Sequence, residues 1–343
     1  MEDKLRRLFE RASVTKGGGI LLGRSVVADG FWPRRKARIV THAHSDHTID
    51  ISKSMSAQGY IAATPVTFTM MKYLGHSVPR AKRKEVEPGS CFKIDDERIC
   101  FIRAEHIPGS VQVLVENENG FRVLYTGDFK NPGSGTPIVE DLDVLIVDAT
   151  YGDPRYVRPS EAEVEEALVD IIEQALSRGE PVKIYAYYGK IQEVMQLLRR
   201  YGIDVPFLAS GKIFWMSKAL EAHGYCFGDL YNLSSQEGKE ILKGDHIHFV
   251  HFNRFSKDRD GNYVRIKLDG WLANKAFQKI GRKDWIVAFS DHADYNGTMR
   301  YVMESKAKIV IVDGYRSSFA KAFASKLRVR GVHAFAMPTL LGL

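Results

Sequence analysis

The hydrophobic residues of this 343-residue chain form short runs that polar turn residues separate. In the first part of the chain the runs favour strands, since their lengths and alternation fit a sheet better than a helix. Residues 59–76 change from strand-like to helix-like spacing. The sequence NENG at 117–120 is a strong signal for a hairpin between its neighbouring strands. The predicted strands of this part lie within residues 19–30, 36–44, 97–106, 109–128 and 142–152.

The pattern changes near residue 155. Residues 158–181 predict a helix in which Ser160 is the N-cap, Glu163 completes a capping box, and Gly179 and Pro181 mark the end. A buried strand at 182–188 and a second helix follow, and this alternation is typical of a parallel α/β unit.

The last part of the chain returns to short apolar strands that end in polar loops, at 284–294 and 307–314, followed by a final helix. We therefore predict one α/β sandwich, formed by residues 1–154 and 284–343, with an α/β domain inserted at 155–283. The length of the chain also favours two domains.

The composition of the chain indicates a class of binding partner and a cellular location. A hydrophobic content of 44% and a charged content of 27% are ordinary for a globular protein, and the net charge of +7 favours anionic partners, nucleic acid first. Neither a signal peptide nor a membrane span is evident, so we expect a cytoplasmic protein without a membrane partner. The three scattered cysteines, Cys91, Cys100 and Cys226, argue against a disulfide framework and for a reducing compartment.

Candidate chemistry is concentrated in the sequence THAHSDH at 41–47, directly after an apolar strand. His42, His44, Asp46 and His47 supply the imidazole and carboxylate groups that zinc binds in catalytic sites. The alternative is a solvated polar loop. His106, Asp128 and His292 also follow apolar strands, so all of these side chains are expected at one edge of a sheet.

These motifs resemble those of the metallo-β-lactamase superfamily, in which such a histidine motif is followed by a distant histidine and a GD pair. The insertion, VDATYGDP and FSDHADY are similar to the β-CASP nucleases; AEHIPGSV, YTGDFK and YGK resemble the DNA-repair branch that includes Artemis. The resemblance runs from about Asp29 to Gly314. It implies an αββα sandwich with an inserted β-CASP cap domain.

The resemblance also implies roles for individual residues. Asp29 would brace the histidine loop. One zinc ion would be held by His42, His44, His106 and Asp128, and a second by Asp46, His47 and the shared Asp128. Manganese or magnesium are alternatives to the two zinc ions. Asp148 and His292 would pair near the leaving oxygen, and Thr150, Tyr151, Lys190 and Ser290 would bind a terminal 5′-phosphate.

One position departs from the family. RNA-processing members carry a histidine where this chain has Asp313, and the DNA branch usually has an apolar residue there. Asp313 would either complete the second metal site or cap the last helix, and the sequence favours neither role.

The expected function is a metal-dependent 5′-to-3′ DNA exonuclease in repair, with Asp46, Asp148 and His292 as catalytic residues. The alternatives are an RNA-processing nuclease of the same fold, a small-molecule metallohydrolase, and a non-catalytic nucleic-acid-binding relative. The segment FNRFSKDRDGNYVRIK at 252–267 mixes basic and aromatic residues, as single-strand grooves do, but a charged hairpin explains it equally well. HIHFVHF at 246–252 is interpreted as a half-exposed strand.

Overall fold

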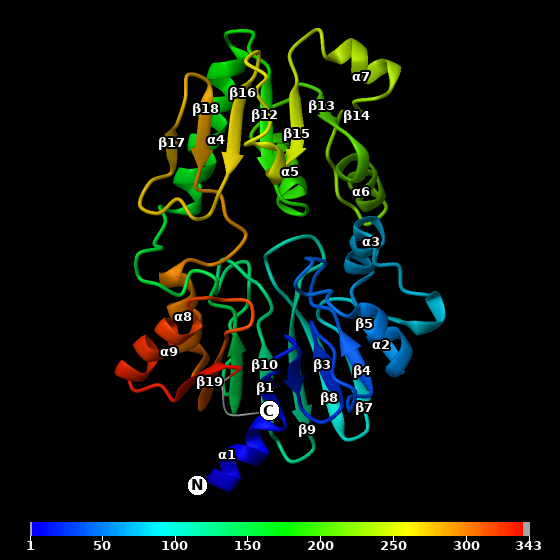
Figure 1. Cartoon of the computed structure of the whole chain (residues 1–343), viewed down its shortest axis with the longest axis vertical. Coiled ribbons are helices and arrows are strands. Elements are labelled where there is room, and N and C mark those ends of the chain that lie inside the picture. The colour runs from blue at the N-terminus through cyan, green and yellow to red at the C-terminus, as the bar shows by residue number, and fades with distance from the viewer. Residues whose placement is uncertain (1, 339–343) are drawn as a thin grey trace. The chain divides into compact units, whose positions relative to one another are not determined.

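The computed structural model describes residues 2–338, with side chains from residue 6 onward, and the chain forms two compact units (Figure 1). The first contains Met1–Arg155 and His292–Leu343, and the second contains Tyr156–Asp291. The segment Asp284–Val287, expected to return to the sandwich, instead pairs with two strands of the second unit. The chain therefore re-enters the first unit at His292, eight residues later than the sequence indicated.

The first unit has two sheets that face one another. The six-stranded sheet runs in chain order through β1 (Ala12–Val14), β2 (Ile20–Leu22), β3 (Val26–Ala28), β4 (Ala37–Ile39), β5 (Tyr60–Ala63) and β6 (Arg83–Glu85). The seven-stranded sheet has the order β20-β19-β11-β10-β9-β8-β7. Its strands are β7 (Cys91–Ile94), β8 (Glu97–Arg103), β9 (Val111–Asn117), β10 (Arg122–Tyr125), β11 (Val144–Val147), β19 (Ile309–Asp313) and β20 (Ala334–Met337).

The core of this unit lies between the two sheets, where side chains such as Ile39 and Ala62 meet Val113 and Ile146. Burial of these apolar faces is the main force that holds the sheets together. Helices cover the outer faces: α2 contacts β5 on one side, and α8 and α9 contact β11, β19 and β20 on the other (Figure 1). The unit is thus the predicted αββα sandwich. Its helices are α1 (Glu2–Phe9), α2 (Ile51–Ala57), α3 (Pro65–Leu74), α8 (Tyr295–Ser305) and α9 (Ala320–Val329), with a 3₁₀ turn at Arg80–Lys82.

The second unit is built on one seven-stranded sheet of order β14-β13-β15-β12-β16-β18-β17, in which only β17 runs antiparallel to its neighbour. Its strands are β12 (Val182–Ala186), β13 (Phe207–Ala209), β14 (Leu230–Asn232), β15 (Ile247–His251), β16 (Val264–Leu268), β17 (Phe277–Lys279) and β18 (Asp284–Val287). Its helices are α4 (Glu161–Leu176), α5 (Lys190–Arg200), α6 (Gly211–Glu221) and α7 (Gln236–Ile241), with a 3₁₀ turn at Phe252–Arg254. The capping box of Ser160 and Glu163 is present at the start of α4, as predicted.

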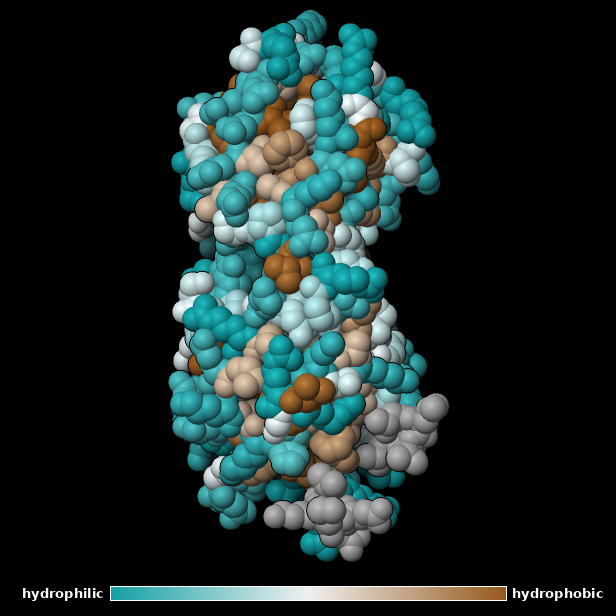
Figure 2. All heavy atoms as spheres, turned by 90° about the vertical axis from the view of Figure 1, so that its left-hand side faces the viewer, coloured by the Kyte–Doolittle hydropathy of each residue, from teal (hydrophilic) through white to brown (hydrophobic). Residues whose placement is uncertain are grey.

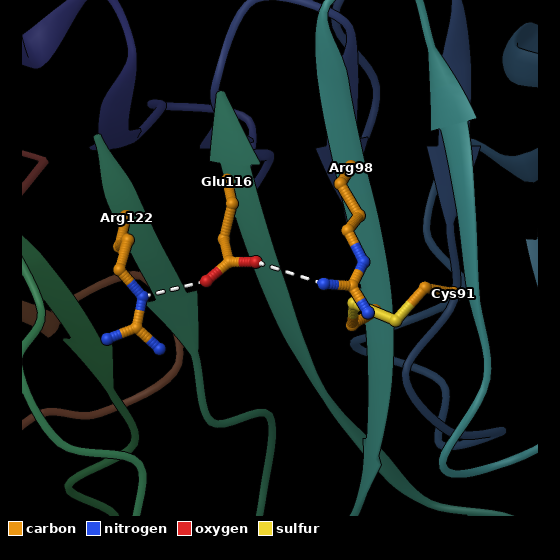
Figure 3. Close-up of a disulfide and its surroundings, with 5 residues drawn as sticks. Cys91, Arg98, Glu116 and Arg122 are labelled. Carbon is orange, nitrogen blue, oxygen red and sulfur yellow. Dashed lines mark hydrogen bonds and ion pairs between the residues drawn. A yellow bond between two sulfur atoms is a disulfide. The ribbon is translucent and has the colours of Figure 1, made fainter. Parts of the chain in front are cut away.

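The cysteines depart from the prediction. Cys91 on β7 and Cys100 on β8 are directly opposite one another in the antiparallel register and form a disulfide (Figure 3). Cys226 remains a free, exposed thiol. Cysteine spacing gave no sign of this bond, because the strand register, and not a CxxC motif, brings the two sulfur atoms together.

The same sheet surface carries a short row of charges across three strands. Glu116 on β9 lies between Arg98 on β8 and Arg122 on β10, and its carboxylate is 3.8 Å and 2.8 Å from the two guanidinium groups (Figure 3). Opposite charges on neighbouring strands favour this pairing.

The exposed surface is mainly polar. On the face shown in Figure 2, apolar atoms occupy small areas bordered by hydrophilic side chains. The larger exposed apolar side chains of the second unit include Trp271, Phe277 and Ile280. Among residues 2–338, no helix combines the length and the apolar character needed to cross a membrane.

Gly30 follows Asp29, at a point where two backbone segments lie very close together. A Cβ atom at Gly30 would overlap the backbone of Gly18 and Gly19, which cannot move as a side chain can. We therefore expect Gly30→Ala to lower the free energy of unfolding by about 1–3 kcal/mol, as overpacking does. Urea unfolding measures this loss. Gly17→Ala is the matched control, since no described atom lies within 4 Å of its added Cβ, and an equal loss in both variants would contradict the overlap.

Candidate metal centre

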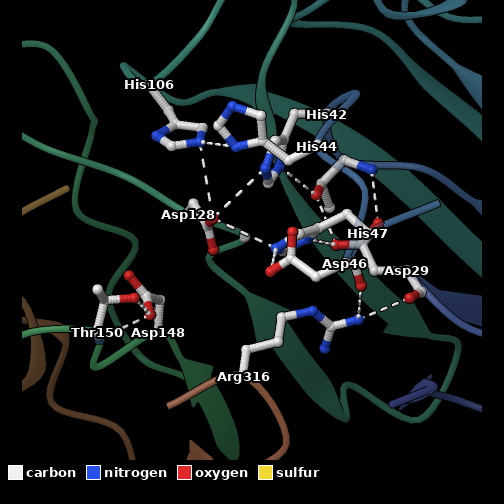
Figure 4. Close-up of polar contacts among 12 residues, drawn as sticks. Asp29, His42, His44, Asp46, His47, His106, Asp128, Asp148, Thr150 and Arg316 are labelled. Carbon is white, nitrogen blue, oxygen red and sulfur yellow. Dashed lines mark hydrogen bonds and ion pairs between the residues drawn. The ribbon is translucent and has the colours of Figure 1, made fainter. Parts of the chain in front are cut away.

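The predicted ligands converge on one region of the first unit. The loop after β4 carries His42, His44, Asp46 and His47, while His106 and Asp128 follow β8 and β10 of the other sheet. Figure 4 shows these side chains pointing toward one another around Asp128. The strand ends therefore gather the imidazoles and carboxylates as the sequence predicted.

Asp128 is the centre of the arrangement. Its Oδ2 atom lies 3.4 Å from His42 Nε2, 3.3 Å from His47 Nε2, 3.6 Å from His106 Nε2 and 3.8 Å from His292 Nε2. Burial alone would raise the pKa of Asp128, but the surrounding imidazoles, His47 and His292 first, hold it well below its usual range. The carboxylate is consequently ionised and offers oxygen to any cation among these rings.

Two buried nitrogen atoms lack a partner that a metal ion would supply. Within residues 2–338, neither His42 Nε2 nor His47 Nε2 has a hydrogen-bond partner, although both side chains are fully buried. Unpaired buried polar atoms are costly and uncommon in folded proteins. Both point at Asp128, so the side chains present fit a cation at this position.

The other ring nitrogen of each histidine fixes its orientation. Thr41 Oγ1 donates its proton to Asp29, so it accepts from His42 Nδ1 at 3.1 Å. His47 Nδ1 donates to Asp29 Oδ2 at 2.7 Å. Both Nε2 lone pairs are therefore directed at the centre, which is the outer-sphere arrangement of metal-binding histidines.

Asp29 is the brace that the resemblance implied. It is fully buried at a positive φ of 54°, and it accepts hydrogen bonds from the Thr41 backbone, the Thr41 hydroxyl and His47. Burial would raise the pKa of Asp29, but His47 and Arg316 lower it. It is therefore a fixed negative charge beneath the loop.

The two predicted metal positions differ in how closely their ligands gather. Ligand atoms of His42, His44, His106 and Asp128 all lie within 4.8 Å of one another, close enough to hold one ion. For the second position, Asp46 Oδ2 is 3.5 Å from His47 Nε2. Burial lowers the pKa of His47, yet Asp128 and Asp46 outweigh it and raise the pKa. The carboxylates thus favour a positive charge beside Nε2, and a metal ion there would take the place of the proton.

Asp148 and His292 pair as the resemblance implied. His292 Nδ1 lies 3.0 Å from Asp148 Oδ2, while the other carboxylate oxygen accepts from the Thr150 backbone and hydroxyl, both at 2.8 Å. Burial and the Asp128 carboxylate raise the pKa of Asp148. Asp128, Asp148 and His292 are also close enough to hold an ion themselves.

Arg316 is a site residue that the sequence analysis missed. One guanidinium nitrogen donates to the backbone oxygens of Gly18, Asp29 and Asp46, at 2.9, 2.6 and 3.0 Å, and the other donates to Asp313 at 2.8 Å (Figure 4). Its side chain is only 4% exposed. No spacing motif marks this residue, because its partners are mostly backbone carbonyls.

Asp313 does not cap the last helix, since α9 begins at Ala320 with Phe319 as its N-cap. It closes the turn that follows β19 instead. Its Oδ1 accepts from the backbone of Tyr315 and Arg316, and its Oδ2 pairs with the Arg316 side chain. It is absent from the groups of described residues that could hold an ion. With both oxygens engaged in this way, we leave Asp313 out of the ligand set.

A family model agrees with this geometry. Residues 32–179 match the beta-lactamase superfamily domain. The chain belongs to the metallo-β-lactamase superfamily. The matched region contains all six residues proposed here as metal ligands and ends at residue 179, just after α4, the first helix of the second unit.

Several nucleases are among the proteins whose sequences are similar to this superfamily member. It is 54% identical over 125 residues to an uncharacterised protein of Acidianus ambivalens from the lig 3′ region, covering 36% of this chain and 88% of that one. It is 27% identical to the mouse 5′ exonuclease Apollo over 94% of this chain and 59% of Apollo. An RNase J-like protein of Methanocaldococcus jannaschii is 26% identical over 52% of this chain and 48% of its own. These relatives are consistent with the β-CASP nucleases of the cross-link-repair branch.

The phosphate-binding residues expected in this superfamily member divide between the units. In the first, the Thr150 hydroxyl holds Asp148, and the Tyr151 ring lies edge-on to His292 at 6.1 Å. In the second, Lys190 is buried and pairs with Asp291 at 3.0 Å, and Ser290 is partly exposed.

Proposed function

We propose that the protein is a cytoplasmic, metal-dependent nuclease that hydrolyses DNA from a 5′ end and acts in repair. The observation that carries this proposal is the convergence of four imidazoles on one oxygen of Asp128, where two buried nitrogens make no hydrogen bond with any described residue. The similarity to a 5′ exonuclease over 94% of the chain supports cleavage from a 5′ end.

Such a centre suits phosphodiester hydrolysis. Divalent ions would lower the pKa of a water molecule and offset charge on the phosphoryl oxygens, with zinc the ion that this donor set favours. His42, His44, His106 and Asp128 would hold one ion, and Asp46, His47 and Asp128 a second. The residues' own contribution is to keep these donors fixed, through the hydrogen bonds of Asp29 and Thr41 to the histidine rings.

The pair of His292 and Asp148 would serve the leaving oxygen. The 3.0 Å contact orients the His292 ring, so that its Nε2 atom can hold a proton for the departing 3′-oxygen. Thr150 in turn holds Asp148. We assign His292 as the proton donor and Asp148 as its positioning residue, and the proximity of both to Asp128 favours this place in the site.

Recognition of a terminal 5′-phosphate is part of the proposal. Tyr151, Lys190 and Ser290 carry a phenol, an ammonium and a hydroxyl, which are suitable phosphate donors. Thr150 has another role, because its backbone N–H and its hydroxyl both donate to Asp148. We therefore assign Thr150 to the orientation of Asp148 before any contact with the phosphate.

The alternative function is RNA processing, which the likeness to an RNase J-like protein favours. A small-molecule hydrolase is the weaker alternative, since a second α/β unit of this size is more useful for a polymer. The chain spans only part of the length of the nucleases it matches.

A cleavage assay separates these functions. DNA and RNA, single-stranded and duplex, labelled at the 5′ or 3′ end and carrying a 5′-phosphate or 5′-hydroxyl, would be incubated with zinc or manganese. We expect a 5′-labelled DNA strand to release labelled mononucleotide first, and 5′-phosphate ends to react faster.

The control variants make the assay specific to this site. Asp46→Ala should abolish cleavage, whereas Glu304→Ala, which removes an exposed carboxylate on α8, should leave it unchanged. Full activity in Asp46→Ala would refute the assignment. Faster turnover of RNA than DNA would establish the alternative, and equal rates on both 5′ ends would contradict recognition of the 5′-phosphate.

A further inference from the structure

A cavity of about 510 Å³ lies entirely within the second unit, away in sequence from every metal-centre residue. It opens where β12, β13 and β15 end, three strands that pair in parallel. Ligands of parallel α/β sheets bind outside the carboxyl ends of the strands, and the volume is within the roughly 300–1,000 Å³ range of ligand sites. The residues that matter most are Tyr188, Lys212, His248, His251, Arg254 and Lys257.

The lining carries an excess of positive charge. Lys212, Arg254 and Lys257 are basic, and Asp258 is the one acidic residue among the lining residues. The Asp258 carboxylate is already engaged, since it accepts from Tyr185 at 2.6 Å and from Lys183 at 3.2 Å. The charge of the three cations is thus not cancelled from within the cavity, and an anion is the complementary ligand.

Hydrogen-bond donors add to this charge. Ser210 and Lys212 lie at the start of α6, where backbone N–H groups are unpaired, and the Ser210 side chain makes no capping bond to them in the described chain. His251 Nδ1 accepts from the Asn253 backbone, which leaves its proton on Nε2. Burial, with help from nearby cations, lowers the pKa of His251 and brings that of His248 to about 4, so both rings are neutral near pH 7.

Aromatic rings lie beside the cations. The Tyr188 ring is 4.7 Å from the His251 ring, and next to it Tyr187 stacks on Phe252 at 4.5 Å with an angle of 19°. Tyr187 is 42% exposed. Flat rings next to phosphate-binding cations are the combination used for single-stranded nucleic acid.

We propose that this cavity binds one unpaired nucleotide of a nucleic-acid strand, with its base against Tyr188 and its phosphate on Lys212 and Arg254. The volume admits a base and a phosphate together. Bases of a duplex are stacked and paired, so only an unpaired nucleotide can enter a cavity of this kind. The inference rests on the proposed function for the source of its ligand, and it assigns strand binding to the charged segment at 252–267, which supplies Arg254 and Lys257 to the cavity.

Binding, and not cleavage, tests this site. The full chain carrying Asp46→Ala, which should not degrade the probe, would be titrated with a fluorescent single-stranded DNA over a range of salt concentrations. Adding Lys212→Ala and Arg254→Ala should weaken binding by roughly tenfold or more and reduce the salt slope by about 1.4, since each phosphate contact contributes about 0.7 for single strands. Tyr188→Ala should weaken binding without changing the slope.

The matched control is Lys239→Ala with Lys243→Ala, which removes the same amount of positive charge. Lys239 lies on α7 and Lys243 just after it, and neither lines the cavity. We expect this variant to bind as the parent does. Competition by adenosine monophosphate, and weaker binding of duplex than of single strand, are further expected results.

Several results would overturn the site. Equal losses in the two double variants, an unchanged salt slope, or a preference for duplex DNA would each do so. Adenosine monophosphate that binds without displacing the strand would show a free nucleotide as the ligand and refute the strand proposal. If the cavity binds the strand but the wild-type protein cleaves no nucleic acid, only the nuclease proposal is refuted. If the protein is a nuclease but the cavity variants bind the strand normally, only the cavity proposal is refuted.

Discussion

Asp128→Asn should reduce phosphodiester hydrolysis by at least about a thousandfold and abolish tight metal binding. The substitution keeps the shape of the side chain but removes the charge that four imidazoles face at 3.3–3.8 Å. Metal ions contribute several kcal/mol of charge stabilisation, and each loss of roughly 1.4 kcal/mol lowers the rate tenfold. A ligand shared by both proposed metal positions should therefore have the largest effect on activity of any single change.

Metal binding provides a measurement that is independent of activity. Ions that bind only the folded chain raise its melting temperature. Zinc should raise the melting temperature of the wild-type protein and have little effect on Asp128→Asn. Asp95→Asn is the control, because Asp95 is an exposed turn residue with a positive φ that asparagine tolerates. An Asp128→Asn variant that responds to zinc as the wild type does would exclude Asp128 as a ligand.

Arg316→Met should be the most destabilising change near the site. It would leave the carbonyl oxygens of Gly18, Asp29 and Asp46 without their donor and the Asp313 carboxylate without its cation. Breaking a buried charge pair by removing one partner costs about 3–5 kcal/mol. We expect a loss of that size in the free energy of unfolding, together with weaker metal binding, because Arg316 holds the backbone of the metal loop at Asp46.

Two further variants separate the charge of Arg316 from its geometry. Arg316→Lys keeps the charge, but an ammonium cannot reproduce the planar fork that reaches several acceptors at once. It should recover part of the stability and less of the metal affinity, as measured by urea unfolding and calorimetric zinc titration. Arg300→Met, at an exposed pair on α8, should change stability by less than about 0.5 kcal/mol. A stable Arg316→Met variant with normal zinc affinity would refute the positioning role.

Much of the metal centre was predictable from the sequence because its residues follow strands. His42, His44, Asp46 and His47 lie close together in one loop, and His106 and Asp128 each closely follow an apolar strand. A sandwich has few strand ends, and many of them lie at a common edge. Ligand-type residues that follow several strands therefore predict a site. The pairing of Asp148 with His292, 144 residues apart, came from the family resemblance and not from spacing.

The errors have a common cause. Cys91 and Cys100 pair through the register of β7 and β8, and Asp284–Val287 joins the second unit through its pairing with β16. Both errors concern which strands are neighbours in a sheet. Local hydrophobic patterns mark where a strand is, but they carry little information about its neighbour.

By itself the sequence predicted many of the strands and helices, the presence of an inserted unit and the residues of the candidate metal centre, because these depend on local periodicity and on residue types close together in the chain. Only the tertiary structure decided that Asp313 pairs with Arg316, that Thr150 holds Asp148, and that a basic, aromatic cavity forms where β12, β13 and β15 end. These contacts join segments that are distant in the chain, or they select one of several possible hydrogen-bond donors for an acceptor. A hydrogen bond is made only where folding brings its two atoms within about 3 Å.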